Sequence, residues 1–292
     1  MQRGTEIQLD TRQGRLAALG WRRAGAPRVL ALHGWLDNAA SFAPLAPLMR
    51  EVDLVALDLP GHGHSAHRHA TARYHFIDYL FDIDAALDAL GWPDCHLLGH
   101  SLGASIAAVY AAAAPERTRS LTLLDGLGPI AAESDRTAER LRRSLARHRQ
   151  GTSTPRHFES LEEMVAARCK VSEVTEAAAR LICERSAREA GKQFTWRSDP
   201  ALNWVSAVVM TENQVLDLLR HVECPTLIFQ ATSESQWFTR DRLEARRRAF
   251  AHARLEAVDG RHHFHMEQPE AIAEPIRAFI FEYDKPAKET EA

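Results

Sequence analysis

Cysteine is scarce in this chain and follows no spacing pattern. The 292 residues contain four cysteines, Cys95, Cys169, Cys183 and Cys224, and none belongs to a C-x-x-C pair of the kind found in zinc and redox sites. Disulfides persist mainly in oxidising compartments, so isolated cysteines are typical of a reducing one. We therefore expect four free thiols that behave as small apolar residues.

Long hydrophobic runs and a strong charge of one sign are also missing. No apolar run approaches the roughly 18 residues that span a bilayer, and the N-terminus MQRGTEIQLDTRQGRL lacks the basic-then-apolar pattern of a signal peptide. The formal net charge is only -3, which favours neither nucleic acid nor an anionic membrane as a partner. We therefore expect a cytoplasmic protein that binds neither.

What the chain does have is an alternation of strand and helix patterns. Residues 5–21 contain two extended stretches around a Gln13-Gly14 turn, and APRVLALHGW and VDLVALD add apolar strands with a short helix expected near 43–50. A helical pattern over 76–90, the strand CHLLG, a helix over 104–114 and the strand SLTLLDG follow. This order predicts an α/β fold, with a parallel sheet covered by helices on both faces.

The alternation stops at Pro129. Residues 130–211 are rich in arginine and resemble consecutive helices, without an apolar stretch typical of a buried strand. The alternation resumes with a helix at 212–221, the strand PTLIFQ, a helix at 239–251, the strand RLEAV and a final helix. The sequence therefore predicts a core formed by residues 1–128 and 212–292, with a helical cap inserted at 129–211.

The sequence GHSLG, residues 99–103, lies directly after a predicted strand and directly before a predicted helix. A serine on such a tight turn projects its Oγ above the edge of the sheet, and Gly99 and Gly103 keep the crowded backbone free of side chains. Ser101 is therefore the candidate nucleophile. The alternative is an ordinary strand-to-helix turn in which the serine caps the helix.

The sequence HGW, residues 33–35, ends another predicted strand, so it is expected at the same edge of the sheet. A serine attacking an acyl carbon creates an oxyanion, which needs hydrogen-bond donors already in place. The backbone N–H groups of Trp35 and Leu102 are the candidates for this oxyanion hole. His33 is expected to support the loop rather than to act as a base.

The segment VDGRHHFHMEQPE, residues 258–270, follows the last predicted strand and supplies the candidate base. Serine is unreactive at its free pKa, so a histidine must accept its proton and later deliver it to the leaving group. We select His262. Clustered histidines also suggest a metal site, but no acidic or cysteine ligand pattern accompanies them, and we expect neither a metal nor another cofactor.

The motifs HGW, DLPGHGHS, GHSLG and the late histidine occur in the order found in the α/β-hydrolase superfamily, which the chain resembles over nearly all residues outside the cap. LHGWLDNAASF, LGHS, LLD and H-x-x-H-M before a proline are more narrowly similar to the serine hydrolase-like proteins. The resemblance implies a mostly parallel eight-stranded sheet, and selects His262, seven residues before Pro269, with His263 as the alternative. It also implies that Asp58, His62 and His64 belong to a structural loop beside the pocket.

The acid of the expected Ser-His-acid triad has two candidate positions. In most members of the superfamily it follows the strand that here reads TLIFQ, where only Glu234 offers a carboxylate. In others, such as the haloalkane dehalogenases, it ends the strand beside the nucleophile strand, which here places Asp125. An unpaired carboxylate would be costly at that rim, so Asp125 is favoured over Glu234. The alternative role for Asp125 is to cap the next turn.

These features together predict a cofactor-free serine hydrolase that cleaves a small-molecule carboxylic ester or thioester through an acyl-enzyme. The alternatives are the same triad used for carbon–carbon bond hydrolysis or perhydrolysis, and a degenerate small-molecule-binding homologue. The cap offers apolar residues for its own core or for the wall of a pocket: Phe158, Met164, Phe194, Trp196, Trp204 and Met210. Its arginines between 136 and 149 are read as a solvated helix face rather than as a site for an anionic substrate.

Overall fold

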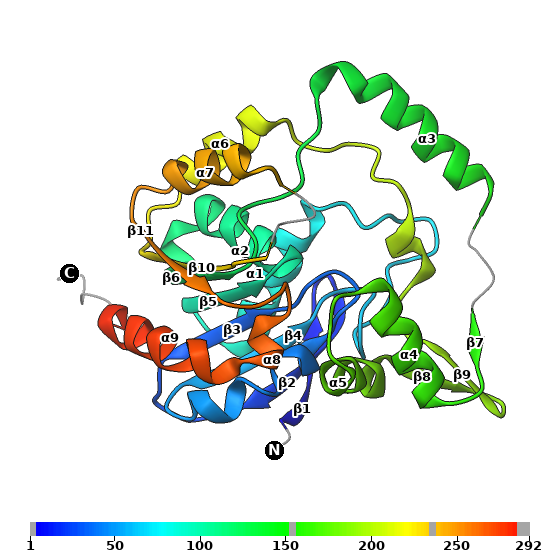
Figure 1. Ribbon diagram of the computed structural model, residues 1–292, viewed down its shortest axis with the longest axis horizontal. Coiled ribbons are helices and arrows are strands. Elements are labelled where there is room, and N and C mark those ends of the chain that lie inside the picture. The colour runs from blue at the N-terminus through cyan, green and yellow to red at the C-terminus, as the bar shows by residue number, and fades with distance from the viewer. Residues whose placement is uncertain (1–3, 152–155, 234–237, 285–292) are drawn as a thin grey trace.

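The main sheet of the protein is mostly parallel. The computed structural model describes residues 4–151, 156–233 and 238–284. Within these residues the main sheet has eight strands in the order β1-β2-β4-β3-β5-β6-β10-β11, and β2 is antiparallel to both of its neighbours (Figure 1). The strands are β1 (Thr5–Thr11), β2 (Gly14–Trp21), β3 (Arg28–Leu32), β4 (Asp53–Asp58), β5 (Cys95–His100), β6 (Thr118–Leu124), β10 (Thr226–Ala231) and β11 (Ala253–Val258). The eight-stranded sheet expected from the sequence is confirmed.

Helices cover both faces of this sheet. Every residue of β4 and β5 is buried, as expected for parallel strands that carry helices on either side. One hydrophobic core lies between the sheet and α1, α2 and α6, and a second lies between the opposite face and α9. The helices of the main fold are α1 (Asp78–Leu90), α2 (Leu102–Ala113), α6 (Glu212–Arg220), α7 (Arg240–Ala249), α8 (Phe264–Glu267) and α9 (Pro269–Tyr283).

The short helix expected near residues 43–50 is replaced by two 3₁₀ turns, η1 (Ala39–Phe42) and η2 (Ala46–Met49). Pro44 and Pro47 explain the difference, because a proline lacks the N–H group that continues an α-helix. A third turn, η3 (Pro115–Arg117), connects α2 to β6. The two turns still bury Phe42 and Met49 against the sheet, so the segment contributes to the core without forming a helix.

The segment between β6 and α6 is not purely helical. It contains η4 (Ser134–Arg136), α3 (Thr137–Arg149), β7 (His157–Phe158), α4 (Leu161–Val171), α5 (Glu176–Ser186), β8 (Ala187–Ala190), β9 (Gln193–Trp196) and η5 (Pro200–Asn203). The small sheet, in the order β7-β9-β8, was not expected. Its strands have two to four residues and are partly exposed, so they lack the apolar run that marks a buried strand.

The two parts of this inserted segment pack differently. Helices α4 and α5 lie against the small sheet around their own hydrophobic core, whereas α3 projects away from the main sheet (Figure 1). Phe158, Met164, Phe194 and Trp196 belong to that core or pack against it. On α3, Leu141 and Leu145 are exposed, and most of the arginines are exposed as well.

Two expectations from the composition concern free cysteines and membrane-spanning helices. All four cysteines are free, and Cys95, Cys183 and Cys224 are buried. Burial raises the pKa of each of these three thiols to about 12, so they are protonated and unreactive near neutral pH. In the part of the chain that the structure describes, every helix is too short or too polar to cross a bilayer.

Candidate active site

Ser101 lies on a strained turn between β5 and α2. Its backbone has φ 52° and ψ -112°, a conformation that residues other than glycine rarely adopt. The Ser101 N–H donates to the carbonyl of Leu124 at 3.0 Å, which ties the turn to the end of the neighbouring strand β6. The turn is therefore a nucleophile elbow in its geometry.

The glycines on either side of Ser101 have no room for a side chain. A Cβ on Gly99 would lie 2.5 Å from the backbone of Ala104, and a Cβ on Gly103 would lie 2.0 Å from the carbonyl oxygen of Leu32. Both distances are far inside van der Waals contact. The glycine spacing that the sequence analysis used is therefore required by the close approach of α2 to β5 and β3.

Ser101, His262 and Asp125 form a continuous chain of hydrogen bonds. The Nε2 atom of His262 lies 2.9 Å from Ser101 Oγ, and its Nδ1 atom lies 2.6 Å from Asp125 Oδ2. A carboxylate only accepts, so Nδ1 carries the proton and Nε2 accepts from the serine hydroxyl. Three residues separated by up to 161 positions are thus brought together in the arrangement of a Ser-His-Asp triad.

The environment of Asp125 favours its ionised form. Burial opposes ionisation, but the hydrogen bond from His262 and the one from the Ala231 N–H at 3.1 Å outweigh it and lower the pKa of the Asp125 carboxyl. The Ala231 residue ends β10, so the strand TLIFQ contributes a backbone donor to the acid. Glu234, the alternative acid, lies outside the described residues.

Backbone strain is concentrated in these loops. The described residues include three non-glycine positions with positive φ: Leu36 (59°), Ser101 (52°) and Asp125 (46°). They follow β3, β5 and β6, whose carboxyl ends meet at one edge of the sheet. Each such conformation costs on the order of 1–3 kcal/mol, and strain of this kind clusters at functional sites.

Trp35 and Leu102 are the residues expected to supply the donors of an oxyanion hole. Trp35 lies in the turn after β3, and Leu102 is the first residue of α2. In the part of the chain that the structure describes, the N–H groups of Trp35 and Leu102 make no turn or loop hydrogen bond to a backbone carbonyl. Trp35 is 47% exposed, so this part of the site is open to solvent.

The other polar residues of the two motif loops make structural contacts. His33 accepts the N–H of Leu59 at 3.0 Å through Nε2 and lies 2.7 Å from the Gly34 carbonyl through Nδ1, so it joins the HGW loop to the loop after β4. Asp58 accepts the N–H groups of Ala39 and His64, both at 2.8 Å. These contacts bear out the reading of His33 and Asp58 as loop supports.

His62, in the same loop, is fully buried, and burial lowers its pKa to about 3. Its unfolded pKa is near 6.5, so the unfolded state binds a proton that the folded state rejects, and stability is lost as the pH falls from 6.5 toward 3. We expect His62→Gln to reduce the slope of unfolding free energy against pH by about 1.2 kcal/mol per unit between pH 5.5 and 4. Urea unfolding at several pH values measures this slope. The two proteins should have nearly parallel profiles above about pH 7.5, and equal slopes between pH 5.5 and 4 would contradict the expectation.

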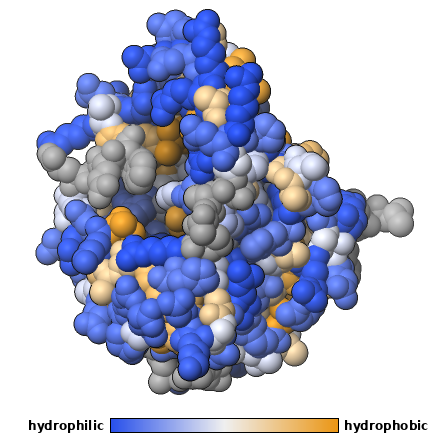
Figure 2. Space-filling view, turned by 90° about the vertical axis from the view of Figure 1, so that its right-hand side faces the viewer, coloured by the Kyte–Doolittle hydropathy of each residue, from blue (hydrophilic) through white to orange (hydrophobic). Residues whose placement is uncertain are grey.

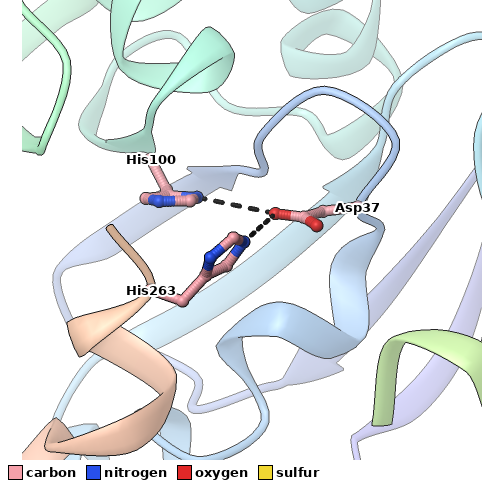
Figure 3. A group of neighbouring side chains, drawn as sticks. All are labelled: Asp37, His100 and His263. Atoms are coloured by element: carbon pink, nitrogen blue, oxygen red, sulfur yellow. Dashed lines mark ion pairs between the residues drawn. The ribbon is translucent and has the colours of Figure 1, made fainter. Parts of the chain in front are cut away.

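A second buried carboxylate, which the sequence analysis did not single out, lies beside the triad. Asp37 Oδ2 is 3.6 Å from His100 Nδ1 and 3.5 Å from His263 Nε2, and Figure 3 shows the three side chains converging from separate elements. His100 precedes Ser101 in the chain, and His263 follows His262. The Nε2 atom of His100 also lies 2.9 Å from the His262 carbonyl, to which it donates. One carboxylate thus contacts the sequence neighbours of both the nucleophile and the base.

The same group is the candidate metal site of the described residues, because its three ligand atoms lie within 4.8 Å of one another. The sequence around the histidines shows no acidic ligand pattern, but the fold brings the Asp37 carboxylate beside two histidines. However, Arg168 of α4 already donates to the Asp37 carboxylate. Burial opposes ionisation of Asp37, yet Arg168 and His263 hold its pKa well below the usual value. The negative charge is therefore already compensated by a guanidinium, beside which a divalent cation would be repelled.

Comparison with known proteins agrees with this fold. The family model described as the alpha/beta hydrolase fold matches residues 27–269, a range that contains all the residues of the triad. The chain belongs to the α/β-hydrolase family. The mostly parallel sheet covered by helices is therefore the fold of its family.

Individual relatives resemble this α/β-hydrolase over almost its whole length. A serine hydrolase-like protein of Dictyostelium discoideum is 29% identical over 96% of this chain and 82% of its own. The crystal structure of a hypothetical protein from Pseudomonas aeruginosa PAO1 is 34% identical with a TM-score of 0.87, covering 94% of this chain and 99% of that one. A thioesterase domain from the curacin biosynthetic pathway shares the fold at 22% identity and a TM-score of 0.81, covering 95% and 99% of the two chains.

Proposed function

We propose that this α/β-hydrolase is a cofactor-free serine hydrolase that cleaves a carboxylic ester or thioester through an acyl-enzyme. The observation that carries the proposal is the chain of hydrogen bonds from Ser101 through His262 to Asp125, at 2.9 and 2.6 Å. The residues are aligned for proton transfer from the serine hydroxyl to the imidazole, with the carboxylate fixing the tautomer.

The proposed reaction has two halves. Ser101 Oγ attacks the acyl carbon while His262 Nε2 takes its proton, and the N–H groups of Trp35 and Leu102 bind the oxyanion. His262 then protonates the departing alcohol or thiol, which leaves an acyl group on Ser101. In the second half His262 activates a water molecule that hydrolyses the acyl-enzyme, and Ser101 recovers its proton.

We assign the inserted segment, residues 129–211, the role of a cap that sets substrate preference. Support comes from its contacts with the rim: Asn38 Nδ2, in the loop after β3, donates to the carbonyl of Ile182 and to Ser186 Oγ on α5, both at 2.8 Å. Figure 2 shows the side of the molecule that includes this segment, where hydrophobic residues gather around a hollow in a largely hydrophilic surface. An apolar acyl group suits such a surface better than a highly charged one.

The proposal is tested with a fluorophosphonate probe and a series of chromogenic esters and thioesters of increasing acyl length. We expect covalent labelling of Ser101 and turnover of at least one ester or thioester. Labelling without turnover of any member would favour carbon–carbon bond hydrolysis or perhydrolysis by the same triad. The absence of both labelling and turnover would contradict the proposal and favour a binding protein without catalysis.

A further inference from the structure

Two buried arginines of the inserted segment reach into the main fold, and they contact different parts of it. Arg168 of α4 contacts the loop after β3, whereas Arg185 of α5 binds Asp58 and Glu6. Their side chains are only 9% and 6% exposed. The two arginines are therefore equally enclosed, but only Arg168 touches the segment that carries an oxyanion-hole donor.

Arg168 makes two contacts with consecutive residues of that loop. Its NH1 group donates to the carbonyl of Leu36 at 3.0 Å, and its NH2 group donates to the Asp37 carboxylate. Leu36 is the residue with a φ of 59°, and it directly follows Trp35. The guanidinium thus holds the carbonyl of Leu36, the strained residue next to Trp35. A small rotation of the backbone there would turn the Trp35 N–H away from the oxyanion.

The contact with Asp37 extends the influence of Arg168 to the base. The Asp37 carboxylate lies 3.5 Å from His263 Nε2 and 3.6 Å from His100 Nδ1, and these histidines adjoin His262 and Ser101 in the chain. Without Arg168, a buried carboxylate would lose its compensating cation. The loop after β3 and the loop before α8 would then both be free to rearrange.

We propose that Arg168 is a positioning residue. It holds the Trp35–Asp37 loop in the conformation required for the oxyanion hole, and through Asp37 it keeps the loop that bears His262 in place beside it. The inference deepens the serine hydrolase function proposed above and rests on it. Docking of α4 on the main fold therefore completes the catalytic geometry, although Arg168 itself does not touch the reacting atoms.

The test compares Arg168→Met with Arg185→Met, which removes an equally buried ion pair from the same segment. The readouts are kcat and KM for a chromogenic ester, and the inhibition constant of an alkylboronic acid, which forms a tetrahedral adduct with serine. We expect Arg168→Met to lower kcat by about 100-fold with KM changed less than about threefold, the size of effect seen when one oxyanion donor is lost. Affinity for the boronic acid should fall by a similar factor. Arg185→Met should lower the melting temperature but leave kcat within about threefold.

Further variants separate positioning from general damage. Arg168→Lys keeps a cation near Asp37 and is expected to recover part of the lost kcat. If Arg168→Met fails to fold, the double variant Arg168→Met/Asp37→Asn removes both buried charges and should fold, yet retain the low kcat and weak boronic acid binding because the Leu36 contact is still missing. Normal kcat in either folded variant, or an equal loss in Arg185→Met, would overturn the inference. A wild-type protein with no labelling and no turnover would instead overturn the proposed function, and the inference would fall with it.

Discussion

Replacement of Ser101 by alanine is expected to abolish ester turnover and fluorophosphonate labelling together. The Oγ atom is the group 2.9 Å from His262 Nε2, and alanine removes it without adding volume to the crowded elbow. Loss of a serine nucleophile from a working triad lowers kcat by roughly 10⁴- to 10⁶-fold, leaving the catalysis that binding and the oxyanion hole supply alone. Initial rates and mass spectrometry of the labelled protein measure the two effects.

The matched control for this variant is Ser120→Ala. Ser120 is a buried serine of the neighbouring strand β6, and its Oγ lies 2.8 Å from His96 Nδ1, away from the triad. Its replacement should cost about 1 kcal/mol of stability through the lost hydrogen bond while leaving labelling at Ser101 intact. Turnover that survives Ser101→Ala, or labelling that moves to another residue, would refute the assignment of the nucleophile.

The three triad candidates could be predicted from the sequence because each follows a recognisable strand. Ser101 and Asp125 come directly after β5 and β6, and His262 follows β11 by a short loop. The carboxyl ends of parallel strands meet at one edge of a sheet, so a correct strand assignment already places these residues near one another. What the strand pattern leaves open is the choice between Asp125 and Glu234 as the acid.

The Arg168–Asp37 contact could not be predicted from the sequence, because no strand pattern places these two residues together. The two residues lie 131 positions apart, and neither strand pattern nor motif connects α4 with the loop after β3. Their meeting depends on how the inserted segment docks, which is a property of tertiary packing. The position of Asp37 in the LHGWLDN loop, at the rim, was the available signal, since a carboxylate there requires a partner once it is buried.

The small sheet of the inserted segment was missed because its strands carry too little sequence information. In β9, QFTW, only Thr195 is fully buried, and β7 has two residues. Alternation over two to four positions does not separate a strand from a loop. The strain at Leu36 and Asp125 was equally hidden, because neither is a glycine and their positive φ values arise from the turns in which they lie.

Replacement of Asp125 by asparagine is expected to lower kcat by about 10⁴-fold with little change in KM. Asparagine preserves the shape of the side chain and can still accept the Ala231 N–H, so the loop should keep its fold. It cannot, however, stabilise an imidazolium, and its amide N–H₂ favours the tautomer of His262 in which Nε2 carries the proton and cannot accept one from Ser101. The pH-rate profile and the labelling rate of the variant measure the loss.

Glu234→Gln supplies the comparison that decides the acid. The Nδ1 atom of His262 carries one proton, and Asp125 Oδ2 already accepts it at 2.6 Å, so a second carboxylate has no donor to bind at that nitrogen. We therefore expect Glu234→Gln to change kcat by less than about threefold. A silent Asp125→Asn together with a large loss in Glu234→Gln would reverse the assignment, and a large loss in both would contradict the expectation for Glu234. With Glu234→Gln silent, the strand β10 that precedes Glu234 has only a backbone role in the site, through the Ala231 N–H bound to Asp125.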